Sequence, residues 1–268
     1  MITLFQFTVW HTLRQSKFRL TAGLLTFPAV IMLVARYATG GLTPDKTWET
    51  YHGVSLFVLL MALMPLVCML HGTSLIGADA EQRTLVYLTT RKLRRATVLL
   101  VRFVAVWGLL TLLFGGAMLL LYLATVANLR LPAESGWQPR GELWIYLSIT
   151  PLGVAAYLGL FTLLSLAFSR PLIVSMIYLA VFELILSNWP VPARKISISH
   201  PQRLTLVNKI ENIDTLGSLD LPPFVRDTIY PPDATGTWTL VIVVAVLLAL
   251  ASILVSTREL VPAKVSRD

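Results

Sequence analysis

The chain has few charged residues and only one cysteine. Charged residues make up 13% of its 268 residues, whereas soluble domains carry about 25%. Cys68 has no second cysteine with which to pair, so an internal disulfide and a multi-thiolate metal site are both excluded. The phosphate loop of many ATPases, Gly-x-x-x-x-Gly-Lys-Ser/Thr, does not occur either. The chain is therefore not expected to be an ATPase of that kind, or an enzyme.

Long apolar runs dominate the sequence. Hydrophobic residues make up 56% of the chain and the mean hydropathy is +0.72, which is typical of an integral membrane protein. A helix needs about 20 apolar residues to cross about 30 Å of hydrocarbon. Six runs approach or exceed that length, namely residues 20–38, 54–76, 103–127, 143–168, 172–187 and 238–255. We therefore expect an all-α, polytopic fold in which residues 1–268 form one transmembrane domain with six spans.

The first 19 residues differ from the spans because their apolar side chains recur at helical spacing. Ile2, Phe5, Val9 and Leu13 share this spacing, and Trp10 lies beside them. Such a pattern is typical of an amphipathic helix that lies in the membrane interface. We expect residues 1–19 to form that interfacial helix.

The distribution of Lys and Arg predicts the orientation of the spans. With six spans and the N-terminus inside, thirteen of the 22 basic residues lie on the cytoplasmic side, six of them between residues 79 and 102. The positive-inside rule then places both termini in the cytoplasm. Topology thus explains the net charge of +8, and no nucleic-acid partner is expected. Residues 77–102 form a cytoplasmic segment, and residues 188–237 form a long outer loop.

The first half of the cytoplasmic segment has the pattern of a short amphipathic helix. Asp79 is expected to cap a helix that begins at Ala80, and Gln82 three residues later suits a capping box. Leu85 and Leu88 share one face at a spacing of three residues. Spans need no capped helix merely to reverse direction, so this helix suggests a docking role.

The run from Thr84 to Arg95, TLVYLTTRKLRR, resembles the cytoplasmic signature of ABC type-2 permeases. In that family Glu-x-x-Gly-Thr-Leu-x-x-Leu-Leu-x-x-Pro-hydrophobic-Ser-Arg leads into the third span. Positions that match in type and spacing are Asp79, Glu81, Thr84, Leu85, Leu88, Arg91, Arg95, Leu99 and Arg102. Arg83, Lys92 and Arg94 replace the family's Gly, Pro and Ser. The ending STREL, residues 256–260, is similar to the family's tail, and the six-span architecture extends the resemblance over the whole chain.

The resemblance implies the membrane subunit of an ATP-driven exporter in the bacterial inner membrane. The chain would bind no cofactor itself, and ATP and Mg²⁺ would be held by a cytosolic ABC ATPase. A second permease subunit, identical or related, would complete the path through the lipid bilayer. The implied ATPase-coupling residues are Asp79, Glu81, Thr84, Leu85, Leu88, Arg91 and Arg95. The alternative is a non-transporting membrane anchor or sensor that uses the same segment to bind a cytosolic partner.

Glu183 is the one acidic residue placed well inside a predicted span. A charge at the centre of the bilayer costs roughly 2.5–3.5 kcal/mol. One interpretation is a buried ion pair with Arg36, which lies near the outer end of the first span. The other is a carboxylate on the substrate or proton path, and the sequence leaves both open.

Two further regions carry weaker hypotheses. Met61, Met64, Cys68 and His71 share one face of the second span and are soft ligands, but we expect them to fill gaps in an apolar interface, with no metal site. The outer loop, residues 188–237, is rich in proline. The family resemblance implies short helices there that close the outer exit, and the alternative is a passive loop.

Overall fold

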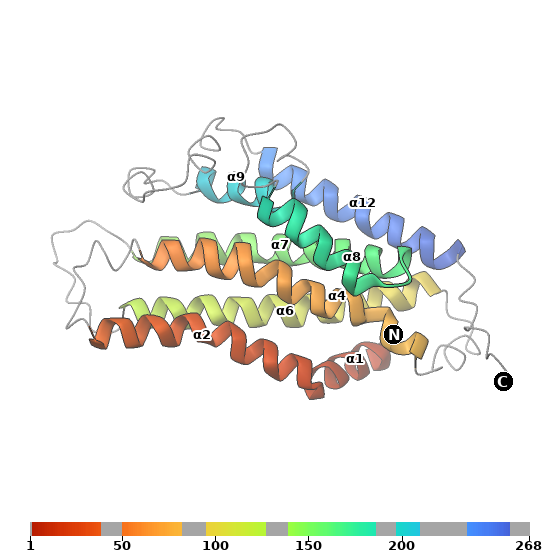
Figure 1. Cartoon of the computed structure of the whole chain (residues 1–268), viewed down its shortest axis with the longest axis horizontal. Coiled ribbons are helices and arrows are strands. Elements are labelled where there is room, and N and C mark those ends of the chain that lie inside the picture. Colours follow the sequence, from red (N-terminus) through yellow and green to blue (C-terminus); the bar gives the residue numbers. More distant parts are fainter. Residues whose placement is uncertain are drawn as a thin grey trace.

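Long helices lie side by side in an elongated bundle (Figure 1). The computed structural model describes residues 2–38, 50–81, 95–126, 139–185, 197–209 and 235–257. These residues are almost entirely helical and include no strand, which confirms the predicted all-α class.

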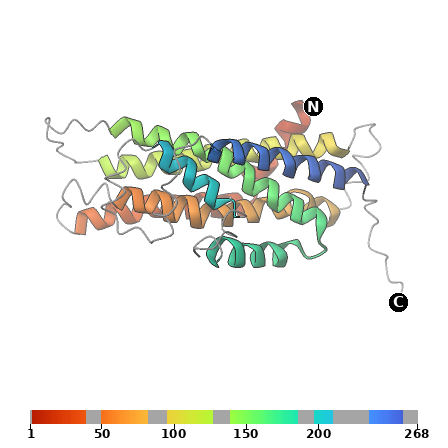
Figure 2. The ribbon, with the colours of Figure 1, turned by 90° about the horizontal axis from the view of Figure 1, so that it is seen from above.

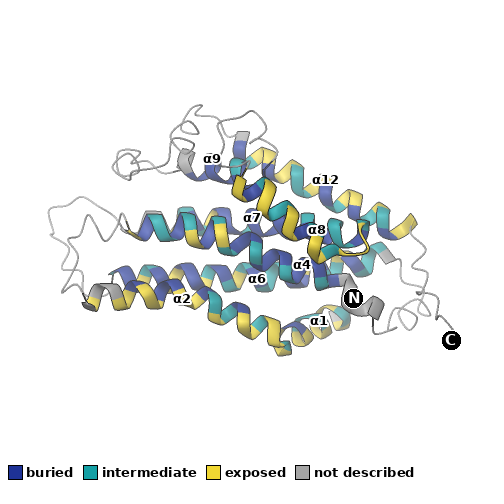
Figure 3. Cartoon of the chain, viewed as in Figure 1, coloured by how far each residue is buried: buried dark blue, intermediate teal, exposed yellow. Residues whose placement is uncertain are grey.

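Within the described ranges, five helices are long and apolar enough to cross a membrane. They are α2 (Ser16–Ala38), the continuous pair η1 (Val54–Leu63) and α4 (Met64–Glu81), α6 (Arg95–Val126), α7 (Pro139–Ala167) and α12 (Thr235–Thr257). Each coincides with one of the predicted runs, and length and composition alone identify it as a candidate span. Exposed residues, yellow in Figure 3, lie along the outside of the bundle, and many of them are large and apolar, so they give lipid an apolar surface to contact.

The predicted span at residues 172–187 is shorter than the other five. It consists of α8 (Pro171–Tyr178), which has a proline at its start, and the π-helix η2 (Leu179–Ile185). At 1.5 Å per residue this helix reaches roughly 22 Å, less than the hydrocarbon thickness of about 30 Å. A full-length sixth span is therefore not seen among the described residues.

A further short helix, α9 (Ser199–Lys209), lies within the segment predicted to be an outer loop. It packs against α7 and α12 (Figure 2). Figure 1 shows it near the end of the bundle at which α7 and α12 begin. This part of the predicted loop is therefore helical and belongs to the bundle.

The N-terminal helix α1 (Ile2–Arg14) is shorter than the helix predicted over residues 1–19, because α2 begins at Ser16, and it packs against α6 and α2. Its Thr12 is buried, whereas Phe7 and Trp10 are 62% and 60% exposed. The Arg14 guanidinium lies over the Trp10 ring, 4.8 Å from its centroid. One side of α1 thus offers an aromatic and basic surface at the end of the bundle where α6 begins.

The three prolines inside the predicted spans fall within helices or at a change of helix type. Pro28 lies inside α2 and Pro151 lies inside α7. Trp107 Nε1 donates a hydrogen bond of 2.9 Å to the Pro151 carbonyl. Pro65 follows the π-helix η1, where the hydrogen-bond register of the helix changes. Because proline has no N–H to donate, it disrupts this ladder, and neighbouring helices stabilise the altered turns.

The crossing of α4 and α7 is the tightest described contact between long helices. A Cβ placed on Gly72 would lie 2.8 Å from the Phe161 Cβ and 3.3 Å from the Leu158 carbonyl oxygen. Glycine at this point allows the two backbones to approach closely, as small residues do where membrane helices pack.

Replacing Gly72 with alanine should lower the stability of the chain by about 1–3 kcal/mol, because the added methyl forces this crossing apart. Gly116 on α6 is the matched control, since a Cβ there meets no atom within 4 Å. Gly116→Ala should be neutral or raise stability by up to about 1 kcal/mol. Thermal unfolding in detergent measures both, and equal melting temperatures for the two variants would contradict the tight crossing.

Candidate functional site

A set of buried polar side chains lies between η2, α7 and α9, inside an otherwise apolar bundle. Its members are each at most 6% exposed and comprise Glu183, Ser197, Ser199, Gln202, Arg203 and Thr205. Burying a polar group is unfavourable unless the group is hydrogen-bonded. This polar cluster is therefore the part of the described chain where a specific role is most expected.

Glu183 connects η2 to the residues that precede α9. Its two carboxylate oxygens accept hydrogen bonds from Ser197 Oγ at 2.9 Å and from the Ile198 amide at 3.2 Å. Ser197 Oγ in turn lies 2.7 Å from Ser199 Oγ and accepts a bond from the Ser199 amide. Because α9 begins at Ser199, the carboxylate lies at the positive end of that helix, where negative charge is stabilised.

Two tyrosines complete the surroundings of this carboxylate. Tyr157 of α7 and Tyr178 of α8 lie close enough to Glu183 to interact with it electrostatically, and Arg203 of α9 lies close to Tyr157. The Tyr178 ring also stacks on Phe182 of η2, with centroids 5.0 Å apart. Side chains from three helices thus surround the contact between η2 and α9.

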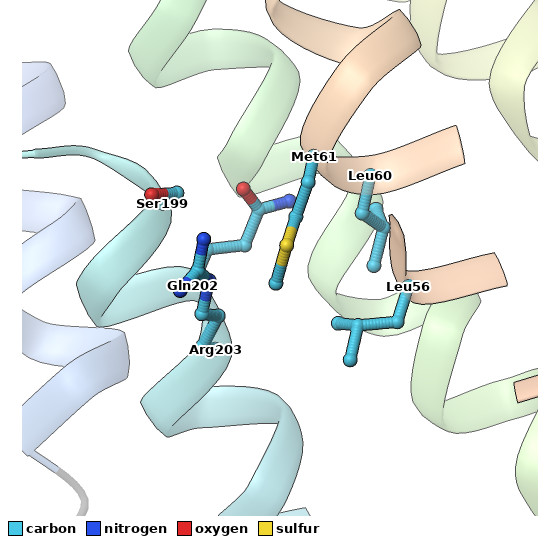
Figure 4. A pocket seen from close by; sticks show the side chains of 6 residues that line it. All are labelled: Leu56, Leu60, Met61, Ser199, Gln202 and Arg203. Atoms are coloured by element: carbon cyan, nitrogen blue, oxygen red, sulfur yellow. The ribbon is translucent and has the colours of Figure 1, made fainter. Parts of the chain in front are cut away.

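Beside the polar cluster is a narrow cleft that leaves no room for a water-sized molecule (Figure 4). One wall is apolar and comes from the second span; the other is polar and comes from α9. The lining residues are Leu56, Leu60 and Met61 on the first wall and Ser199, Gln202 and Arg203 on the second. In Figure 4 the Met61 side chain lies between the two walls, so it occupies the space that a ligand would need.

Two glycines allow α9 to lie this deep in the bundle. A Cβ on Gly153 of α7 would lie 2.6 Å from Gln202 Nε2, and one on Gly236 of α12 would lie 2.9 Å from the Pro201 carbonyl oxygen. Gly153 is roughly 15 Å along α7 from Leu143, where the candidate span begins. Measured along α7, Gln202 thus lies well past the start of the candidate span, whereas its neighbour Pro201 lies beside Gly236, the first residue of the candidate span in α12.

The predicted intramembrane residues are only partly described. Glu183 is buried, and Ser197 and Ile198 bind it. The Arg36 side chain lies outside the described residues, so the predicted Glu183–Arg36 ion pair stays a prediction. Figure 1 shows that α2 extends further than η2 toward the end of the bundle where α7 begins.

The predicted ATPase-coupling residues lie mostly outside the described part of the chain. Those in residues 82–94, which include Thr84, Leu85, Leu88 and Arg91, are not described at all. Asp79, Glu81 and Arg95 have described helical backbone only, in the last turn of α4 and the first turn of α6. The expected N-cap at Asp79 was wrong, because α4 runs unbroken to Glu81 and an N-cap residue has non-helical backbone angles.

The soft side chains of the second span contact different neighbours. Met64 Sδ accepts a 3.4 Å bond from Gln202 Nε2, Cys68 Sγ lies 3.9 Å from the Val154 carbonyl oxygen, and His71 Nε2 lies 3.2 Å from Thr21 Oγ1. Among the described residues no three His, Cys, Asp or Glu side chains form a metal-binding group. These contacts agree with the expected packing role.

Sequence reasoning missed Gln202, Arg203 and Tyr157 as members of the polar cluster. A proline two residues after Ser199 is typical of the first turn of a helix, and that pattern could have indicated α9. Nothing in the sequence indicated that this polar helix packs inside the bundle. No protein-family model matches the chain, and no curated protein matches it in sequence.

Replacing Glu183 with alanine should destabilise the chain by about 1–3 kcal/mol, because the Ser197 hydroxyl and the Ile198 amide lose their acceptor. Glu183→Gln is the matched control, since its amide oxygen still accepts one of the two bonds and the loss should be smaller. Thermal unfolding in detergent measures both variants.

The double variant Glu183→Ala/Arg36→Ala tests whether Glu183 is stabilised mainly by Ser197 and Ile198 or by the predicted ion pair with Arg36. If Ser197 and Ile198 are the principal partners, the double variant is no more stable than Glu183→Ala alone. Recovery of stability in the double variant would show that the uncompensated charge of Arg36 is the larger effect, and would contradict the assignment.

Proposed function

We propose that this chain is the membrane-spanning permease subunit of an ATP-driven ABC exporter. In this proposal a separate cytosolic ATPase binds the cytoplasmic segment, residues 77–102, and drives substrate across or out of the membrane. The support is the resemblance of residues 79–102 to the coupling signature of ABC type-2 permeases, together with the arrangement of the helices that flank this segment.

The single observation that carries the proposal is the length of α6. Its 32 residues correspond to roughly 48 Å, well beyond the hydrocarbon thickness of about 30 Å. The helix that contains the candidate span Thr50–Leu75 likewise continues beyond Leu75 to Glu81, the last residue of α4. Two helices that extend past the bilayer are suited to carry the intervening segment to a cytosolic partner and to transmit its movement.

The position of α1 supports the same arrangement. It packs against α6 and lies at the end of the bundle where α4 ends and α6 begins (Figure 1). Its exposed Phe7 and Trp10 suit the interfacial layer of the bilayer. An interfacial helix beside the coupling segment would keep the base of α6 at a fixed depth while the segment beyond it moves.

We also infer six membrane crossings, the fifth of which includes the short helix of α8 and η2. Figure 1 shows α7 and α12 beginning at the same end of the bundle, so the chain must return between them. The short helix of α8 and η2 covers part of that return, and α9 lies nearer the end where α12 begins.

The packing of α4 provides a route from the coupling segment to the polar cluster. A rigid displacement of its cytoplasmic end would act on α7 through the close crossing at Gly72 and on Gln202 through Met64. Packed helices move as bodies between discrete arrangements. ATP-driven closure of two ATPase subunits would thus alter the contacts of α9.

The assembly proposed is two permease subunits with two ATPases in a bacterial inner membrane, with both termini of each permease in the cytoplasm. The second permease would be another copy of this chain or a related one. ATP and Mg²⁺ would be bound on the ATPase, since this chain has no phosphate loop of the Gly-x-x-x-x-Gly-Lys-Ser/Thr type.

Leu85→Asp should abolish coupling to the ATPase, because a charge buried in an apolar groove costs about 3 kcal/mol or more, equivalent to about 100-fold in affinity. Tyr87→Asp is the matched control, since a helix places residue 87 about 200° round from Leu85. Copurification of the ATPase and its stimulated hydrolysis in proteoliposomes measure the effect.

Normal ATPase binding and stimulation in Leu85→Asp would contradict the proposed docking site. If the copurified complex hydrolyses ATP at a rate indifferent to every candidate substrate, the sensor alternative is favoured over export. Loss of activity in both variants would place the binding surface elsewhere on residues 82–94.

A further inference from the structure

The corner at which α1 ends and α2 begins carries basic side chains beside exposed aromatic rings. Arg14, Lys17 and Arg19 are exposed around the bend at Gln15, and α1 and α2 contain no Asp or Glu. Three cations without an acidic residue in either helix favour an anionic partner. We propose that this corner binds the phosphate head group of an anionic phospholipid, with Arg14 as its principal ligand.

Arg14 is oriented for this role by Trp10, one helical turn earlier. The guanidinium lies over the indole ring, 4.8 Å from the ring centroid. Within the described part of the chain, no oxygen accepts a hydrogen bond from it. Stacking uses the face of the planar guanidinium and leaves its N–H edges available, in a geometry that fits two phosphate oxygens. The contact with Trp10 thus presents a group that is suited to bind a phosphate.

The corner lies at the boundary of the apolar layer. The candidate span in α2 begins at Ser16. Phe7 and Trp10 are exposed on one side of α1, and Leu20 is exposed one turn into α2. Such side chains favour the region just below the lipid head groups, where the acyl chains begin. A phospholipid at this corner would therefore place its phosphate beside Arg14 and its acyl chains against these apolar side chains.

Contacts within the protein hold the corner in place. The Gln15 amide donates a 3.2 Å bond to the Thr12 carbonyl oxygen and closes the bend. Thr21 Oγ1 donates a 2.7 Å bond to the Lys17 carbonyl oxygen and lies 3.2 Å from His71 Nε2 of α4. The first turn of α2 is therefore joined to the second span. A surface that is already ordered loses little conformational entropy when a ligand binds.

The positive-inside rule explains basic residues near a span, but it does not require an arginine stacked on an exposed tryptophan. Arg170 provides the comparison. It is exposed at the turn between α7 and α8, which Figure 1 shows toward the end of the bundle where α6 begins. No described aromatic ring stacks on it. Arg170 is therefore a cation at the same end of the bundle without an aromatic platform.

Quenchers carried by lipids measure this binding in the full chain. Cys68→Ala removes the only native cysteine, and Ser16→Cys, at an exposed position of the corner, carries a bimane fluorophore. The labelled chain is placed in nanodiscs of phosphatidylcholine with a small, constant fraction of phosphatidylglycerol. Bromine is attached to the acyl chains of the phosphatidylglycerol, or of an equal amount of the phosphatidylcholine, so the head-group composition is the same. Ser169→Cys, beside Arg170, is the matched control position.

Brominated phosphatidylglycerol should quench the label at position 16 more strongly than brominated phosphatidylcholine does, and the excess should be small at position 169. Arg14→Gln should reduce the enrichment of phosphatidylglycerol about fivefold, since each cation near an anionic surface contributes about 1 kcal/mol. Arg14→Lys should retain part of the enrichment. Trp10→Leu should reduce it about twofold, because the guanidinium loses the ring that orients it.

Equal quenching by the two brominated lipids at position 16 would overturn the proposal, and so would equal enrichment at positions 16 and 169. Unchanged enrichment in Arg14→Gln would contradict the role of Arg14. Inorganic phosphate, compared with chloride at the same ionic strength, should not remove the enrichment. If it does, the corner recognises free phosphate and the assignment to a lipid is wrong.

The proposal requires α1 to lie at the membrane interface, but it does not require export. The comparison of the two brominated lipids needs no substitution of Arg14 or Trp10, so it decides the matter even if those variants do not fold. Because the assay contains no ATPase, its outcome is independent of the Leu85→Asp experiment.

Discussion

The hydrogen bonds from Ser197 Oγ and the Ile198 amide to Glu183 are the contact on which the polar interior of this bundle depends. In hydrocarbon every backbone polar group needs a partner inside the protein, so a helix can be interrupted at membrane depth only where such partners exist. Glu183 supplies one at the start of α9. With α9 held there, Gln202 and Arg203 come to face the apolar wall of the second span.

The second span links the two ends of the proposed mechanism. The second span carries Met61 and Met64 beside α9 and continues through Gly72, where it crosses α7, to Glu81. A displacement that enters at the Glu81 end of this helix therefore has a packed route to the cleft. The route consists of side-chain and backbone contacts and requires no deformation within either helix.

The five long spans could be predicted from the sequence because hydropathy reports directly on which solvent a segment prefers. The end of the second span could not be predicted, because a helix can continue past the bilayer as readily as it can stop there. The cap expected at Asp79 lies within α4. The place of α9 was also beyond prediction. It depends on the close approach allowed by Gly153 and Gly236, which involves residues far apart in the sequence.

The central claim is that the segment of residues 77–102 binds an ATPase, and photo-crosslinking from position 85 tests it most directly. A benzoylphenylalanine at that position would be activated in native membranes, and the attached protein would be identified by mass spectrometry. The account predicts a cytosolic chain with a nucleotide-binding phosphate loop, cross-linked in a yield that changes when ATP and Mg²⁺ are added. A cross-linked partner without any nucleotide-binding motif would contradict it.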